Sequence, residues 1–194
     1  MNIIRSNEVK TSVWSGGTTT ELAIWPSDAI YANRDFTWRL SSAEVNDEKS
    51  TFTPLPNYER FITIRKGSLR LKHDDGAWYE ISEGDVAEFD GGSATESEGK
   101  VTDFNLMLRK EVAEGTLDVE FAEAGETLEL DAAKAEGFTA LFLSRGKTLR
   151  IEADGADVGE LEEGDLLIIE EGEAVDSLAA YAESDSCIIR ADIK

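Results

Sequence analysis

Four short segments in the first half of the chain place polar side chains beside aromatic ones. They are residues 14–21, 38–41, 52–60 and 103–107. Arg60 is the most informative residue among them, because it shares strand parity with Ile62 and Ile64 and enters the core if those two isoleucines do. A buried guanidinium group needs a partner, and either Glu21 or Asp103 could supply it.

Two interpretations of Arg60 stay open at this point. If its pairing is incomplete, the fork of donors suits a small carboxylate ligand. If its pairing is complete, the ion pair seals the mouth of a barrel. The residues expected to line a ligand site are Arg60, Glu21, Trp38, Arg39, Ser41, Asp103, Asn105 and Met107.

The chain has one histidine, His73, and this argues against a histidine-based metal site. His73 precedes Asp74, Asp75 and Gly76, which is a composition typical of an exposed turn. No segment has the spacing of a calcium loop, a nucleophile elbow or a phosphate-binding loop. We therefore expect no metal, no cofactor and no catalytic residue, and we expect a binding protein rather than an enzyme.

Alternation with period two predicts strands along most of the chain. Residues 36–41 put Phe36, Trp38 and Leu40 on one face, and residues 103–109 separate apolar from polar positions in the same way. No segment has the pattern of an amphipathic helix of several turns. Many short strands separated by Gly, Asp and Asn turns indicate an all-β sandwich or barrel.

An internal repeat organises these strands. Residues 61–92 and 141–172 share the same order of apolar strands and turns, and their Glu-Gly-Asp turns begin 80 residues apart, at Glu83 and Glu163. This layout resembles that of a cupin barrel. We therefore predict a bicupin, with two cupin-like β-barrels of the jelly-roll type at 1–108 and 109–194.

The net charge of −22 is unevenly distributed. Residues 1–110 carry −5 and residues 111–194 carry −17, whereas 12 of the 16 aromatic residues lie before residue 111. Such a negative field repels phosphates and anionic lipids, so we expect neither a nucleic-acid nor a membrane partner. We expect the first module to hold the site and the second to be its acidic support.

The single cysteine, Cys187, excludes an intrachain disulfide, as is common in a reducing compartment. Residues 1–10 lack the basic and apolar segments of a secretory signal, and no apolar run has the length of a membrane span. We expect a cytoplasmic protein.

Four motifs together resemble the HutD/Ves family. They are Trp-x-Gly-Gly-x-Thr-x-Glu at 14–21, Phe-x-Trp-Arg-Leu-Ser-x-Ala at 36–43, Phe-[Ser/Thr]-x-[Phe/Leu]-Pro-x-x-x-Arg at 52–60 and Asp-Phe-Asn-Leu-Met at 103–107. The resemblance implies a bicupin linked to histidine utilisation in bacteria, with a regulatory role and no established catalytic activity. It also implies that a formylated acidic intermediate binds in the N-terminal barrel, at a pocket that includes Arg60, and it leaves a homodimer open.

Three functions compete on these grounds. We favour a non-catalytic, regulatory protein that binds a small carboxylate. The first alternative is a metal-independent cupin epimerase or isomerase, with an acid/base pair formed by His73 and an aspartate or by Tyr58 and Tyr79. The second is a structural bicupin whose acidic half docks a basic protein partner.

Overall fold

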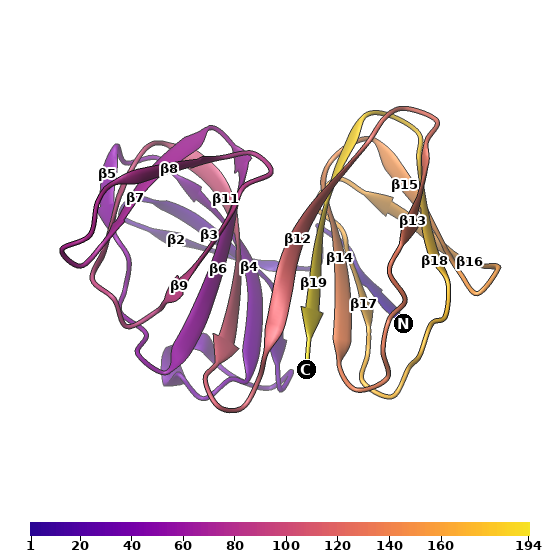
Figure 1. Ribbon diagram of the computed structural model, residues 1–194, viewed down its shortest axis with the longest axis horizontal. Coiled ribbons are helices and arrows are strands. Elements are labelled where there is room, and N and C mark those ends of the chain that lie inside the picture. The colour runs from indigo at the N-terminus through magenta and orange to yellow at the C-terminus, as the bar shows by residue number, and fades with distance from the viewer. The chain divides into compact units, whose positions relative to one another are not determined.

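The computed structural model describes residues 1–194 and is built almost entirely of β-strands (Figure 1). It divides into two compact units. The first unit is Lys10–Glu114, and the second unit is Met1–Val9 together with Gly115–Lys194. The all-β prediction is confirmed, and the only helix is a single 3-10 turn. The structure contains no helix that could span a membrane.

The first unit contains β2 (Lys10–Trp14), β3 (Gly17–Trp25), η1 (Tyr31–Asn33), β4 (Trp38–Val45), β5 (Lys49–Thr51), β6 (Tyr58–Lys66), β7 (Ser68–His73), β8 (Tyr79–Ser82), β9 (Val86–Asp90), β10 (Thr95–Glu98) and β11 (Val101–Arg109). Its strands form two antiparallel sheets, with the orders β2-β3-β4-β11-β6-β9 and β5-β10-β7-β8. An apolar cluster that includes Ile62, Leu71 and Phe89 lies between the two sheets.

The second unit contains β1 (Asn2–Ile4), β12 (Gly115–Ala122), β13 (Thr127–Leu130), β14 (Phe138–Arg145), β15 (Thr148–Ala153), β16 (Ala156–Glu162), β17 (Leu166–Ile169), β18 (Leu178–Ala182) and β19 (Ser186–Ile193). Its sheets have the orders β1-β17-β14-β19-β12 and β13-β18-β15-β16. Its core is a larger apolar cluster that includes Leu141, Ile151 and Ile188.

The strand order shows that the chain is internally duplicated. The run β4-β11-β6-β9 of the first unit has the same order as β12-β19-β14-β17 of the second, and β5-β10-β7-β8 has the same order as β13-β18-β15-β16. The glycines of the two Glu-Gly-Asp turns, Gly84 and Gly164, both have positive φ, 93° and 90°. Glycine adopts this conformation at little cost, which explains why both turns contain it.

The observed units differ from the predicted modules in two respects. The break lies between Glu114 and Gly115 rather than after residue 108, and residues 1–9 belong to the second unit. Strand β1 pairs with β17, for example Asn2 with Ile168, and local patterns do not reveal a pairing between residues so far apart. In addition, the sheets of each unit stay open rather than closing into barrels.

A buried aspartate holds the start of the chain within the second unit. Asp165, in the second Glu-Gly-Asp turn, accepts hydrogen bonds from Arg5 Nη1 at 2.7 Å, from the Ser6 amide at 2.8 Å and from the Glu162 amide at 3.1 Å. The equivalent Asp85 of the first unit is exposed and accepts a bond from the Ser82 amide. The same turn motif therefore carries an additional structural role in the second unit.

Candidate functional site

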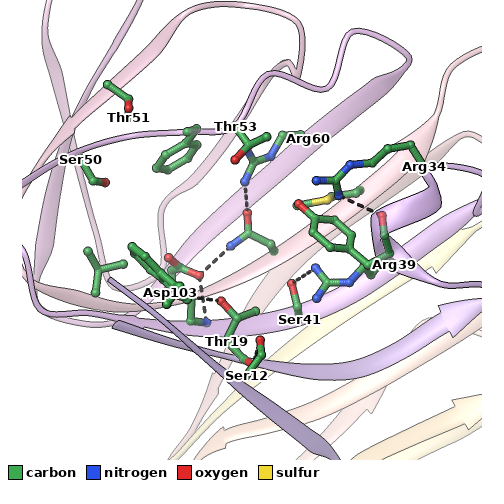
Figure 2. Close-up of a pocket in the computed structure, with 17 residues that line it drawn as sticks. Ser12, Thr19, Arg34, Arg39, Ser41, Ser50, Thr51, Thr53, Arg60 and Asp103 are labelled. Carbon is green, nitrogen blue, oxygen red and sulfur yellow. Dashed lines mark hydrogen bonds between the residues drawn. The ribbon is translucent and has the colours of Figure 1, made fainter. Parts of the chain in front are cut away.

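The first unit contains a cavity of about 410 Å³ bordered by strands β4, β6 and β11. Its charged and amide-bearing lining residues are Arg34, Arg39, Arg60, Asp103 and Asn105 (Figure 2). Three arginines at one cavity stand out in a chain whose net charge is −22. Asp103 is the one carboxylate among the lining residues, so the wall of the cavity is electropositive.

Strand register explains why these side chains meet. On the central strand β11, Met107 lies opposite Arg39 of β4 on one side and Arg60 of β6 on the other. Asn105 lies one step along the same face, and Asp103 follows it. Because side chains alternate between the faces of a strand, these residues all point to the cavity side of the sheet.

Arg60 is buried but incompletely paired. Its side chain is on β6 with 7% of the residue exposed, and its Nη2 donates to Asn105 Oδ1 at 2.8 Å. Its guanidinium carbon lies 4.6 Å from the ring centre of Phe52 and 5.3 Å from that of Phe89. The buried Nε has no hydrogen-bond partner. Burial lowers the pKa of Arg60 to about 10, so the group stays charged at neutral pH.

Asn105 connects Arg60 to the buried carboxyl group of Asp103. Its Nδ2 donates to Asp103 Oδ1 at 2.6 Å, and the Ala43 amide donates to the same oxygen at 3.3 Å. Burial raises the pKa of Asp103 to about 7, although the nearby positive charge of Arg60 and these hydrogen bonds oppose the rise. Asp103 therefore titrates near neutral pH.

Arg39 and Arg34 form a second cationic wall around Tyr31. Arg39 Nε donates to Glu21 Oε2 at 2.8 Å, and its Nη1 donates to Ser41 Oγ at 2.9 Å. The guanidinium carbons of Arg39 and Arg34 lie 4.2 Å and 3.7 Å from the ring centre of Tyr31. Glu21 therefore pairs with Arg39 and not with Arg60, which contradicts one of the two expected pairings.

Six of the eight predicted site residues line the cavity: Arg39, Ser41, Arg60, Asp103, Asn105 and Met107. Glu21 is outside the lining and reaches it through Arg39. Trp38 is on the opposite face of β4 and stacks on Trp25, with ring centres 6.5 Å apart. Adjacent residues of a strand point to opposite faces, so Trp38 does not line the cavity that Arg39 lines.

The sequence analysis missed two lining residues, Tyr31 and Arg34. They belong to the 3-10 turn η1 and the residue after it, where no strand pattern marks which way a side chain points. A cation placed three residues after a tyrosine is the one local signal available, since it allows the observed contact between the guanidinium and the ring.

A second cavity, of about 470 Å³, lies in the second unit and provides a natural comparison. Its buried arginine, Arg190, donates from Nε and Nη2 to the two carboxylate oxygens of Asp192, at 2.6 and 3.0 Å. Its Nη1 donates to the carbonyl oxygen of Asp131 at 2.7 Å. Arg190 is therefore paired within the protein, whereas Arg60 retains an unpartnered donor.

The residues considered for acid/base catalysis lie outside the lining of the Arg60 cavity. His73 Nδ1 is 2.9 Å from Thr95 Oγ1 and its Nε2 is 2.8 Å from the Tyr79 hydroxyl. His73 ends strand β7 and is half-buried, so the expectation of an exposed turn residue was wrong. Tyr58 is buried and donates to the carbonyl oxygen of Phe36.

No group of three or more His, Cys, Asp or Glu side chains is arranged to hold a metal ion.

We expect Asp103 to make stability fall as the pH rises. Its folded pKa is raised, so its favourable contribution is complete below pH 4 and is lost as the pH rises through about 7. In urea unfolding, Asp103→Asn should gain about 2 kcal/mol over the wild type between pH 5 and pH 8. A difference between the two proteins that does not change with pH would contradict this assignment.

Comparison with known structures first defines the class of protein. The chain has the fold of cupin-like proteins such as the vicilin of hazelnut, Corylus avellana. That comparison has a TM-score of 0.69 at 8% identity and covers 98% of this chain and 84% of the other. At such identity the likeness concerns the fold alone.

A family model and two solved structures define the family of the chain more narrowly. The HutD family model matches residues 6–188, and the chain belongs to the HutD family. HutD of Pseudomonas fluorescens SBW25 is similar over 100% of this chain and 98% of its own, at 21% identity and a TM-score of 0.73. A conserved protein of unknown function from Pseudomonas aeruginosa PAO1 covers the same shares at 23% identity and a TM-score of 0.85. No curated protein sequence matches the chain.

Proposed function

We propose that the first unit binds a small carboxylate in the Arg60 cavity, and that the protein acts in a regulatory role through this binding rather than by catalysis. The observation that carries the proposal is the buried guanidinium of Arg60, which belongs to a residue lining the cavity and is incompletely paired within the protein, since its Nε has no partner. A buried donor without a partner is costly, and a charged one more so. A ligand that supplies the missing acceptor recovers that cost.

A carboxylate suits the Arg60 guanidinium better than a neutral ligand does. Its two oxygens match the planar fork of a guanidinium group, and the hydrogen bonds formed are charge-assisted. Phe52 and Phe89 lie beside the Arg60 guanidinium and the residue is largely buried, so the attraction is less screened than it is in water. Arg39 and Arg34 extend the positive surface along the cavity wall.

Related structures support an anionic ligand by analogy. The P. fluorescens HutD structure is described as obtained under a formate condition. A vicilin of eggplant, Solanum melongena, is described as having different anionic ligands in structurally similar pockets. The regulatory role rests on the resemblance to HutD/Ves proteins, and a formylated acidic intermediate is the ligand that this resemblance favours.

We propose further that both units are cupin-type modules, that the protein is cytoplasmic, and that nucleic acids and membranes are not its partners. The duplicated strand order supports the first statement. The single buried cysteine, Cys187, and the net charge of −22 support the others. A homodimer formed through sheet edges remains an open part of this proposal.

A ligand panel measured by thermal unfolding tests the proposal. We expect formate, acetate, urocanate or N-formyl-L-glutamate to raise the melting temperature, because a ligand at 100 times its dissociation constant adds about 2.7 kcal/mol. Formamide and acetamide are matched neutral controls and should have no effect. Failure of every carboxylate to stabilise the protein, or equal stabilisation by the neutral amides, would overturn the proposal.

A further inference from the structure

Asp103 is a buried acid on the same cavity wall as the guanidinium that is proposed to bind the ligand. The residue is 3% exposed and lines the cavity. Asn105 lies between the two charges, accepting from Arg60 at 2.8 Å through Oδ1 and donating to Asp103 at 2.6 Å through Nδ2. Both ends of the amide are thus engaged, so a change of charge at Arg60 is felt at Asp103 through a short, fixed connection.

The other ionisable groups around Asp103 are mostly cations. Arg60 and Arg65 on β6 are its charged neighbours, and Arg39 on β4 and Arg34 and Tyr31 at η1 line the same cavity. Two further groups are outside the lining: Glu21 on β3 contacts Arg39, and His73 on β7 is near Arg60. Glu21 is already paired with Arg39 at 2.8 Å. His73 stacks on the ring of Phe89, with ring centres 4.5 Å apart, and burial lowers its pKa from the usual value. Among the residues that line the cavity, Asp103 is the one that carries a carboxyl group.

We propose that the cavity takes up its carboxylate ligand together with one proton, which Asp103 holds. This inference rests on the proposed function of the Arg60 cavity. A carboxylate on Arg60 compensates the positive charge that favours ionised Asp103, and it adds a negative charge nearby. Both effects favour the protonated acid, which can then donate a hydrogen bond into the cavity. The proton comes from solvent and binds a carboxylate oxygen of Asp103.

Linkage gives the expected pH dependence. The pKa of Asp103 is about 7 in the unliganded protein, so above pH 7 each bound ligand requires a proton to be taken up. The affinity should then fall by roughly tenfold for each pH unit above 7 and level off below pH 6. Simple carboxylates have pKa values well below this range, so the ligand itself contributes no titration there.

Isothermal titration with N-formyl-L-glutamate, and with formate as the smallest carboxylate, tests the inference. The affinity is measured from pH 5.5 to pH 8.5. At pH 8 the titration is repeated in two buffers of different ionisation enthalpy, so that the number of protons taken up is measured directly in the wild-type protein. We expect about one proton for each ligand bound at pH 8.

Two variants separate Asp103 from other sources of pH dependence. Asp103→Asn should bind with no proton uptake and with an affinity that does not change with pH. His73→Gln, which alters the nearby histidine outside the cavity lining, should keep the proton uptake of the wild type.

The titrations distinguish failure of the proton coupling from failure of carboxylate binding. Binding without proton uptake in the wild type, or proton uptake that persists in Asp103→Asn, would overturn the coupling and leave the proposed function standing. Absence of binding at every pH would overturn the proposed function and the coupling together.

Discussion

Replacing Arg60 by methionine should abolish most of the carboxylate affinity of the protein. Removing one partner of a buried, hydrogen-bonded charge pair costs about 2–5 kcal/mol, or roughly 30-fold to several thousand-fold in affinity. The fold should tolerate the change, because Arg60 Nε has no partner and its side chain already lies against Phe52 and Phe89. Below pH 7, where Asp103 is largely neutral, we expect the variant to be as stable as the wild type or more stable.

Arg70→Met is the matched control for this prediction. Arg70 lies on β7 of the same unit, is half exposed, and pairs with Glu98 at 2.6 Å away from the cavity lining. Exposed pairs of this kind contribute little to stability. Calorimetric titration should therefore give a wild-type affinity for Arg70→Met. Retention of affinity in Arg60→Met, or an equal loss in the two variants, would contradict the role of Arg60.

Replacing Asp165 by alanine should strongly destabilise the protein. The change removes the acceptor for Arg5, Ser6 and Glu162 and so weakens the attachment of the first residues to the second unit, where β1 still pairs with β17. We expect a loss of about 3 kcal/mol in the free energy of unfolding at pH 7, measured in urea.

The duplicated turn supplies the control for Asp165. Asp85→Ala, at the equivalent position of the first unit, removes one hydrogen bond of an exposed side chain and should cost under about 1 kcal/mol. The pH dependence gives a second check. Burial acts to raise the pKa of Asp165, but its bonds to Arg5, Ser6 and Glu162 outweigh this and lower it, so its stabilising effect is present at neutral pH and is lost in acid. Equal losses in the two variants would show that Arg5 does not hold the segment.

Much of the site follows from strand alternation alone. Ile62 and Ile64 are apolar and buried, so parity places Arg60 on their side of β6, and the structure agrees. The alternation of Asp103 and Asn105 with Phe104 likewise puts the two polar side chains on one face of β11. These predictions succeed because successive side chains of a strand point to opposite faces, whichever strands are its neighbours in the sheet.

The partners of these side chains depend on which strands are neighbours in the sheet and on which residues are opposite each other. The sequence shows neither. Glu21 contacts Arg39 because β3 pairs with β4 with an irregularity between Glu21 and Ala23. Asn105 contacts Arg60 because β6 and β11 are neighbours in the sheet, although the two residues are 45 positions apart in the sequence. Tyr31 belongs to a turn without periodicity, so the sequence has a local signal for its contact with Arg34 but none for its contact with Arg39.

The two units illustrate how a duplicated fold can differ in chemistry. Each has a cavity bordered by a buried arginine, but Asp192 and the Asp131 carbonyl pair Arg190 in the second unit. Arg60 has an asparagine as its direct partner and keeps a free donor. Since the strand order is shared, the difference in how the two arginines are paired arises from a few side chains and not from architecture.

A high-resolution crystal structure grown with saturating N-formyl-L-glutamate or formate tests the central claim most directly. We expect carboxylate density in the first unit, with an oxygen within hydrogen-bond distance of the Arg60 guanidinium and the cavity in the second unit without ligand. A carboxylate bound away from Arg60, or a cavity around Arg60 that stays empty at a saturating concentration, would contradict the claim.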